Sequence, residues 1–173
     1  MNILIYGHKS KFSTHFESYE IFDNSINHYH KIDHTLDVNP NLTGYDTLIN
    51  FRRKNQITVL ENVFSKWKYE EKTIVNIGSR SKYPNLSKGY RYSSEKAALS
   101  HAASNMRFLS DKKCRIIDIN PGLIESHLPS LTWHEVSKVV WWCISLPIHI
   151  EVGELNLWEK TPYNIISSLK DNL

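Results

Sequence analysis

The stretch Thr73-Ile74-Val75-Asn76-Ile77-Gly78-Ser79 decides the fold class of this chain. Its residues up to Ile77 are mainly β-branched and apolar, which is typical of a parallel strand buried on both faces. A polar loop follows as far as Gly89, and a helix is predicted to begin near Tyr92. A buried strand that leads through a loop into a helix is the repeating unit of an α/β protein.

The same alternation of strands and helices extends along the chain in both directions. The predicted strands are Asn2–Tyr6, Asp46–Phe51, Thr73–Gly78, Cys114–Asn120 and Glu154–Trp158, with two weaker ones at Ile26–His30 and Thr35–Val38. The predicted helices are Ser13–Ile21, Asn55–Tyr69, Tyr92–Leu109 and Val136–Ile144, the last preceded by a capping box of Thr132 and Glu135. We therefore predict an α/β fold of the Rossmann-like, doubly wound kind, with a mainly parallel sheet, in a single minimal domain over residues 1–173.

The composition is that of an ordinary globular protein. The chain has 173 residues, of which 40% are hydrophobic and 23% charged, and this suffices for one domain with a sizeable core. A net charge of +3 does not indicate a general polyanion-binding role, so no nucleic-acid partner is predicted. Cys114 and Cys143 fall in predicted strand and helix cores and are interpreted as reduced, buried thiols.

Nothing in the sequence predicts a membrane segment. The longest wholly apolar run, Val139–Ile144, is far shorter than the about 18 residues that a transmembrane helix needs. No charged head and apolar body precede a cleavage site, because the chain enters a predicted strand at Asn2. We therefore expect no membrane partner and a cytoplasmic location.

Three residues with complementary chemistry follow the deciding strand: Ser79, Tyr92 and Lys96. Tyr92 and Lys96 are four residues apart on a predicted helix, so they share one face. An ammonium beside a phenol stabilises the phenolate and lowers the pKa of the phenol from about 10 toward neutrality. The Ser79 hydroxyl, at the end of a neighbouring strand, can hold a substrate oxygen against that phenol. The three residues together predict proton transfer to a carbonyl oxygen.

With the Pro121-Gly122 turn that stops the strand 114–120, the chain resembles the short-chain dehydrogenases/reductases. In that family a serine lies about a dozen residues before a Tyr-x-x-x-Lys helix, and a strand ending in Pro-Gly follows. The resemblance spans nearly the whole chain, and residues 151–155 resemble the approach to the family's last strand. It implies an NAD(P)-dependent oxidoreductase that reduces a small-molecule carbonyl or oxidises the matching alcohol.

The resemblance also implies roles for individual residues. Tyr92 would be the general acid/base, Lys96 would assist it and bind the nicotinamide ribose, and Ser79 would position the substrate carbonyl. Asn55 is the nearest candidate for the catalytic asparagine of the family, and Asn62 is a weaker one. The cofactor-binding residues implied are Gly7, Lys9, Ser10, Lys11, Phe12, Asn50, Phe51, Arg52, Lys96, Pro121, Gly122, Leu123 and Ile124.

The loop after the first strand departs from the family pattern. It reads Gly7-His8-Lys9-Ser10-Lys11-Phe12-Ser13, so only the first glycine is present. Lys11 and Ser13 stand where further glycines would let the backbone approach a pyrophosphate. The predicted helix start still offers free N–H groups to an anion, and Lys9, Ser10 and Lys11 add charge and donors.

The identity of the cofactor depends on the end of the second strand. No acidic residue ends the predicted strand 26–30, where a carboxylate would bind the ribose of an unphosphorylated cofactor. We therefore predict NADP, with NAD as the alternative. The basic residues expected around this position are His28, His30, Lys31, Lys9, Lys11, Arg52 and Arg53.

Other interpretations of these features stay open. The altered glycine loop is compatible with a non-catalytic ligand-binding or regulatory protein on a degenerate Rossmann scaffold. Basic and aromatic residues interleave at Lys82-Tyr83 and over 88–92, as in single-strand nucleic-acid grooves, but a substrate loop for an anionic or sugar-like ligand is the simpler interpretation. His28 and His30 would share a face of a strand, yet no convincing further ligands accompany them, so no metal is predicted.

The resemblance further implies an oligomer. In the family, two neighbouring helices commonly form a four-helix interface between subunits. The predicted helices 55–69 and 92–109 correspond to them, so we expect a homodimer or homotetramer.

Overall fold

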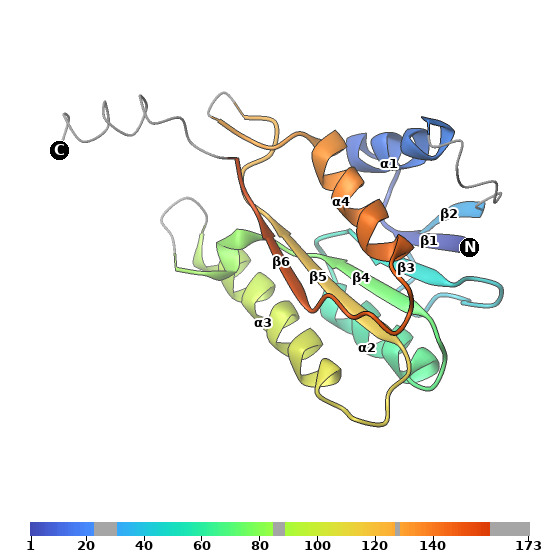
Figure 1. Cartoon of the computed structure of the whole chain (residues 1–173). Coiled ribbons are helices and arrows are strands. Elements are labelled where there is room, and N and C mark those ends of the chain that lie inside the picture. Colours follow the sequence, from blue (N-terminus) through green and yellow to red (C-terminus); the bar gives the residue numbers. More distant parts are fainter. Residues whose placement is uncertain (23–30, 85–88, 127–128, 160–173) are drawn as a thin grey trace, which may run out of the picture.

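Short runs of buried residues form one parallel sheet in the computed structural model, which describes residues 1–22, 31–84, 89–126 and 129–159. The strands are β1 (Asn2–Tyr6), β2 (Lys31–Thr35), β3 (Thr47–Asn50), β4 (Thr73–Ile77), β5 (Arg115–Pro121) and β6 (Glu154–Leu157). Their order is β2-β1-β3-β4-β5-β6, and every neighbouring pair is parallel (Figure 1). The predicted parallel, doubly wound α/β fold is confirmed.

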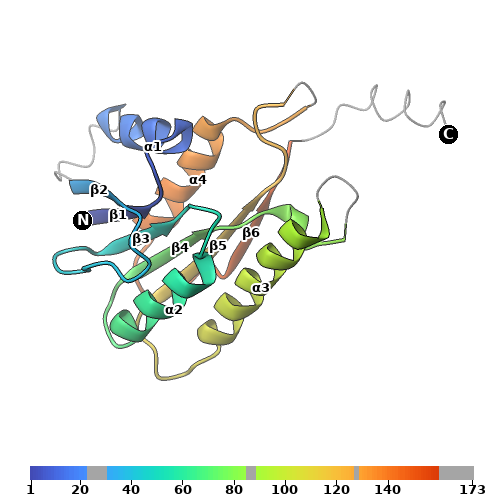
Figure 2. The same ribbon diagram turned by 180° about the vertical axis from the view of Figure 1, so that it is seen from behind.

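Helices cover both faces of this sheet. α1 (Lys11–Phe22) and α4 (Trp133–Ser145) pack together on one face, and α2 (Gln56–Trp67) and α3 (Tyr90–Arg107) lie on the other (Figures 1 and 2). Alternate residues of a strand point to opposite faces, so Ile3 and Ile5 join the core under α1 and α4. Leu4 and Tyr6 join the core under α2 and α3.

The strand order creates a topological switch point. From β1 the chain first builds β2 on one side and then crosses to β3 on the other side of β1. Beyond the carboxyl ends of β1 and β3 the connections diverge to opposite faces of the sheet. This divergence leaves a crevice, and it is the usual ligand site of open α/β sheets.

The second strand differs from its prediction. The expected strand 26–30 lies outside the described residues, and the expected strand 35–38 is wrong because β2 ends at Thr35. Within the described residues β2 pairs only with β1, and none of its residues is fully buried. An edge strand of this kind needs no apolar run, which is why the sequence pattern missed it.

The remaining elements agree with their predictions to within two or three residues. α1 begins at Lys11 rather than Ser13, because Ser10 and Ser13 close its first turn reciprocally: the Ser13 N–H donates to Ser10 Oγ (3.3 Å) and the Ser10 N–H to Ser13 Oγ (2.8 Å). The predicted capping box at the start of α4 is present: the Glu135 N–H donates to Thr132 Oγ1 (3.2 Å), and the Thr132 N–H donates to Glu135 Oε2 (2.7 Å).

Two expectations from the sequence concerned the state of the cysteines and whether any helix could cross a membrane. Cys114 and Cys143 are both buried as free thiols, and burial raises the pKa of each to about 11. Within the described ranges, no helix combines the length and apolar character needed to cross a bilayer.

Candidate functional site

The carboxyl ends of β1, β3, β4 and β5 surround a cavity of about 400 Å³ at the switch point. Of the residues predicted to be catalytic, Ser79, Tyr92 and Lys96 line it. Among the predicted cofactor-binding residues, Gly7, Ser10, Phe51 and Arg52 line its β1 and β3 side. Pro121, Gly122 and Ile124 line its β5 side. Residues from five separate parts of the chain therefore meet in one place.

The three predicted proton-transfer residues come from two elements. Ser79 is buried directly after β4 and caps a short 3-10 turn (η1, Arg80–Lys82), where its Oγ accepts a hydrogen bond from the Ser81 N–H (3.1 Å). Tyr92 and Lys96 lie one turn apart on α3, and Lys96 Nζ is 5.8 Å from the centroid of the Tyr92 ring. The structure brings the three side chains together, while their catalytic roles stay predictions.

Lys96 is held by groups on the neighbouring helix and strand. It is only 5% exposed, and its ammonium donates to Gln56 Oε1 (2.6 Å) and to the Ile77 carbonyl (3.2 Å). Burial, and after it the positive charge of Arg53, lowers the pKa of Lys96 to about 8. With a pKa of about 8, the Lys96 side chain is still mostly charged at neutral pH and loses its proton slightly above it.

Gln56, which the sequence reasoning missed, fixes the position of Lys96. Its Nε2 donates to the carbonyls of Asn50 (2.7 Å) and Ile77 (3.0 Å) at the ends of β3 and β4. Both amide hydrogens are thereby used, so the amide oxygen must face the ammonium. One signal was available: Gln56 lies four residues before Leu60 on the buried stripe of α2, where a polar side chain needs a partner.

A row of buried polar side chains continues from this site across the sheet. Asn50 Nδ2 donates to the Gln56 carbonyl (2.8 Å) and to Asn76 Oδ1 (2.9 Å), and Asn76 Nδ2 donates to Asp118 Oδ1 (2.8 Å). Asp118 pairs with Arg107 at 3.3 Å, and burial raises the pKa of its carboxyl. Asn50 was predicted to bind the cofactor, but its fully buried side chain belongs to this row and does not reach the cavity.

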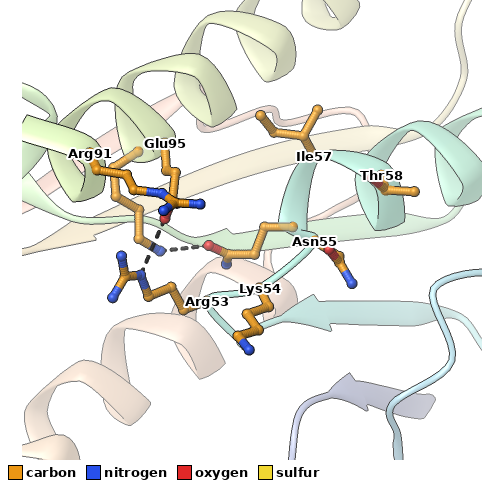
Figure 3. Close-up of a pocket in the computed structure, with 9 residues that line it drawn as sticks. Arg53, Lys54, Asn55, Ile57, Thr58, Arg91 and Glu95 are labelled. Atoms are coloured by element: carbon orange, nitrogen blue, oxygen red, sulfur yellow. Dashed lines mark hydrogen bonds and ion pairs between the residues drawn. The ribbon is translucent and has the colours of Figure 1, made fainter.

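The asparagines predicted as catalytic lie elsewhere. Asn55 precedes α2 with a left-handed backbone (φ 62°), and its exposed side chain points away from Arg53 and Glu95 (Figure 3). It lines a neighbouring pocket but not the cavity. Asn62 donates to the Val38 carbonyl (2.8 Å) on the far side of α2. The structure brings neither to Tyr92.

The loop after β1 is built differently from a glycine-rich phosphate loop. Gly7 closely approaches the residue that follows β3, since a Cβ there would lie 3.2 Å from Phe51 Cδ1. The N–H groups of Ser10 and Ser13 are already used by each other's hydroxyls, so the helix start offers an anion fewer free donors than the sequence predicted.

The other loop residues predicted to bind the cofactor have partners of their own. Phe12 is buried and stacks on Phe51, with ring centroids 4.7 Å apart. Lys11 reaches Glu125 Oε2 (2.7 Å), and Lys9 is exposed outside the cavity. Leu123 is also exposed and does not line the cavity.

The observed second strand removes one reason for preferring NADP, namely the absence of an acidic residue at the end of that strand. β2 ends at Thr35, and the exposed Asp37 follows two residues later. His28 and His30 lie outside the described residues, so the metal interpretation built on them does too. Among the residues that are described, no group of three or more His, Cys, Asp or Glu side chains is arranged to hold a metal ion.

The strand order, the two helical layers and the switch-point cavity define a Rossmann-like α/β protein. No protein-family model matches the sequence, and no curated protein does. Many solved structures match the fold. Serine dehydrogenase from Escherichia coli matches with a TM-score of 0.65 and 20% identity, covering 94% of this chain and 100% of that one.

Two further structures support the same assignment. The closed form of serine dehydrogenase complexed with NADP+ has a TM-score of 0.72 and 18% identity, covering 94% of this chain and 97% of that one. A short-chain dehydrogenase/reductase from Vibrio parahaemolyticus has a TM-score of 0.70 and 12% identity, covering 92% and 100%. The chain therefore has the fold of the short-chain dehydrogenases/reductases, as the sequence motifs predicted.

Proposed function

We propose that this protein is an NAD(P)-dependent oxidoreductase that reduces a carbonyl or oxidises the corresponding alcohol. The observation that carries the proposal is that Ser79, Tyr92 and Lys96 line one cavity at the switch point of the sheet. A hydroxyl, a phenol and an ammonium in one concave site are the groups that proton transfer to a carbonyl oxygen requires.

Each side chain has a defined task in this proposal. In the reducing direction Tyr92 donates its phenolic proton to the carbonyl oxygen, and in the oxidising direction it takes the proton from the alcohol. The Ser79 hydroxyl donates a hydrogen bond to the same oxygen and holds it beside the phenol. The Lys96 ammonium, fixed by Gln56, stabilises the phenolate that remains after the proton has left. The nicotinamide ring, when bound, supplies or accepts the hydride at the substrate carbon.

The residues present fit a nicotinamide nucleotide at its ribose end. Lys96 offers donors to ribose hydroxyls, and Ile77, Ile124 and Trp133 give the cavity an apolar wall suited to a flat ring. At the phosphate end, Arg52 lines the cavity beside Gly7. We keep NADP as the proposed cofactor on the positive charge of Arg52 alone; NAD is the alternative, which Asp37 beyond β2 would favour.

Cofactor binding and turnover test the proposal directly. Calorimetric titration with NADPH and NADH is expected to give saturable binding, and a panel of aldehydes and ketones should include one that is reduced with oxidation of the nucleotide. A folded protein that binds neither nucleotide at millimolar concentration would overturn the proposal in favour of a non-catalytic binding protein.

The oligomer implied by the resemblance is a further proposal. The outward faces of α2 and α3 would form the interface of a homodimer or homotetramer. Sedimentation velocity at several protein concentrations measures this, and a monomer at every concentration would contradict it.

A further inference from the structure

A second pocket, of about 700 Å³, lies beside the cavity and shares Arg53 and Lys96 with it. It is formed by the segment after β3, the start of α2 and the first turns of α3 (Figure 3). Four cationic side chains line it, against the single carboxylate of Glu95. The cationic side chains are Arg53, Lys54, Arg91 and Lys96. The pocket therefore has an excess of positive charge.

Glu95 holds two guanidinium groups in a way that leaves their binding faces free. Its Oε2 contacts Arg53 Nε at 3.2 Å, and its Oε1 contacts Arg91 Nε at 3.6 Å. Within the described parts of the chain, the terminal nitrogens of both arginines donate no hydrogen bond, and the Arg91 side chain is 86% exposed. Arg53 also lies over the Tyr92 ring, with its Cζ 4.8 Å from the ring centroid. Two guanidinium forks are thus presented to an oxyanion.

The surroundings add to the positive potential. α2 and α3 both begin at this pocket, and neither has an acidic residue in its first turn or a side-chain hydrogen bond at its cap. Unpaired N–H groups at a helix start favour a nearby anion. The positive charge of Arg53 adds to burial in lowering the pKa of Lys96, and the Glu95 carboxylate only partly opposes it.

We propose that this pocket binds an oxyanion carried by the substrate, such as a carboxylate, between the guanidinium groups of Arg53 and Arg91. The substrate would then be an acidic carbonyl or hydroxy compound, held by Arg53 at the wall shared with the Tyr92 cavity. That the bound oxyanion belongs to the substrate rests on the proposed function. The presence of an oxyanion site in this pocket does not rest on it.

Inorganic phosphate is the probe for the site alone. Calorimetry or chemical-shift titration should give saturable binding that weakens about tenfold in Arg53→Gln and in Arg91→Gln, since each removes a charge-assisted hydrogen bond. Lys138→Gln removes the same charge from an exposed position on α4, across the sheet, and should leave the affinity unchanged. Glu95→Gln should tighten binding, because the competing carboxylate is gone. Equal phosphate affinities in all four variants, or no saturable phosphate binding, would rule out an oxyanion site in this pocket.

A second titration separates a substrate group from a cofactor phosphate. With NADPH saturating, phosphate is expected to bind as tightly as to the free protein. Competition between the two, relieved in Arg53→Gln, would assign the pocket to the cofactor and overturn the substrate proposal. If NADPH does not bind at all while phosphate binding depends on both arginines, the oxyanion site is supported and the proposed oxidoreductase function fails.

Discussion

The amide of Gln56 is fixed with its oxygen 2.6 Å from the Lys96 ammonium, because both of its hydrogens are donated to strand-end carbonyls. This one side chain ties the start of α2 to the ends of β3 and β4 and to the middle of α3. Gln56 fixes the position of Lys96, and therefore the position of a positive charge near Tyr92.

Replacing Gln56 should change the pKa of Lys96 in a direction set by the new side chain. Gln56→Glu places a carboxylate against the ammonium and should raise the pKa of Lys96 from about 8 by about one unit or more. Gln56→Leu removes the acceptor without adding charge and should lower it. The pH dependence of reductive methylation of Lys96, followed by mass spectrometry, measures both. Identical titration curves in the two variants would show that Gln56 does not control Lys96.

Burial of Lys96 should also appear in the pH dependence of stability. Below about pH 8 the lysine is charged in both the folded and the unfolded state, so the full cost of burying the ammonium is present. Between about pH 8 and 10.5 the folded protein loses this proton while the unfolded chain keeps it, so stability rises with pH, by about 3 kcal/mol in total. The Lys96→Met variant has no titratable group at this position, so this rise in stability with pH should be absent from it.

Urea unfolding of both proteins across this pH range is the measurement. The free energy of unfolding of Lys96→Met minus that of the parent should decrease as pH rises, because only the parent gains stability from the deprotonation of Lys96. Other titrating groups are common to the two proteins and cancel in the difference. A difference that is constant with pH would mean that Lys96 is not desolvated in the folded state.

Much of this arrangement could be predicted from the sequence, and the parts that could not have physical causes. β4 and α2 were predictable because their apolar residues repeat at strand and helix periods, and the spacing of Ser79, Tyr92 and Lys96 indicated one site. β2 was not, because a half-exposed edge strand carries no such pattern. The roles of Gln56, Asn50 and Asn76 depend on which buried polar groups meet across elements, and no local pattern encodes that.

Gly78, at the end of β4, tests how tightly the cavity wall is packed. A Cβ at this position would lie 2.1 Å from Asn120 Oδ1 and 3.6 Å from the Ile119 carbonyl. Gly78→Ala should therefore lower the free energy of unfolding by about 1–3 kcal/mol, because the buried Asn120 must move. Gly89→Ala is the matched control, since nothing lies within 4 Å of its Cβ. Equal urea midpoints for the two variants would contradict the close approach.

Tyr92→Phe removes only the phenolic oxygen that the proposed reaction needs. The ring that packs near Arg53 and Lys96 is kept, so nucleotide affinity should stay within about twofold of the parent, while kcat should fall by about 10²-fold or more because the proton donor is lost. Lys96→Ala should damage both affinity and turnover, since the same ammonium is proposed to face the phenol and the ribose. Calorimetry with NADPH and steady-state rates on one substrate measure the two effects separately. A Tyr92→Phe variant that turns over like the parent would rule out Tyr92 as the acid/base, whatever else the cavity binds.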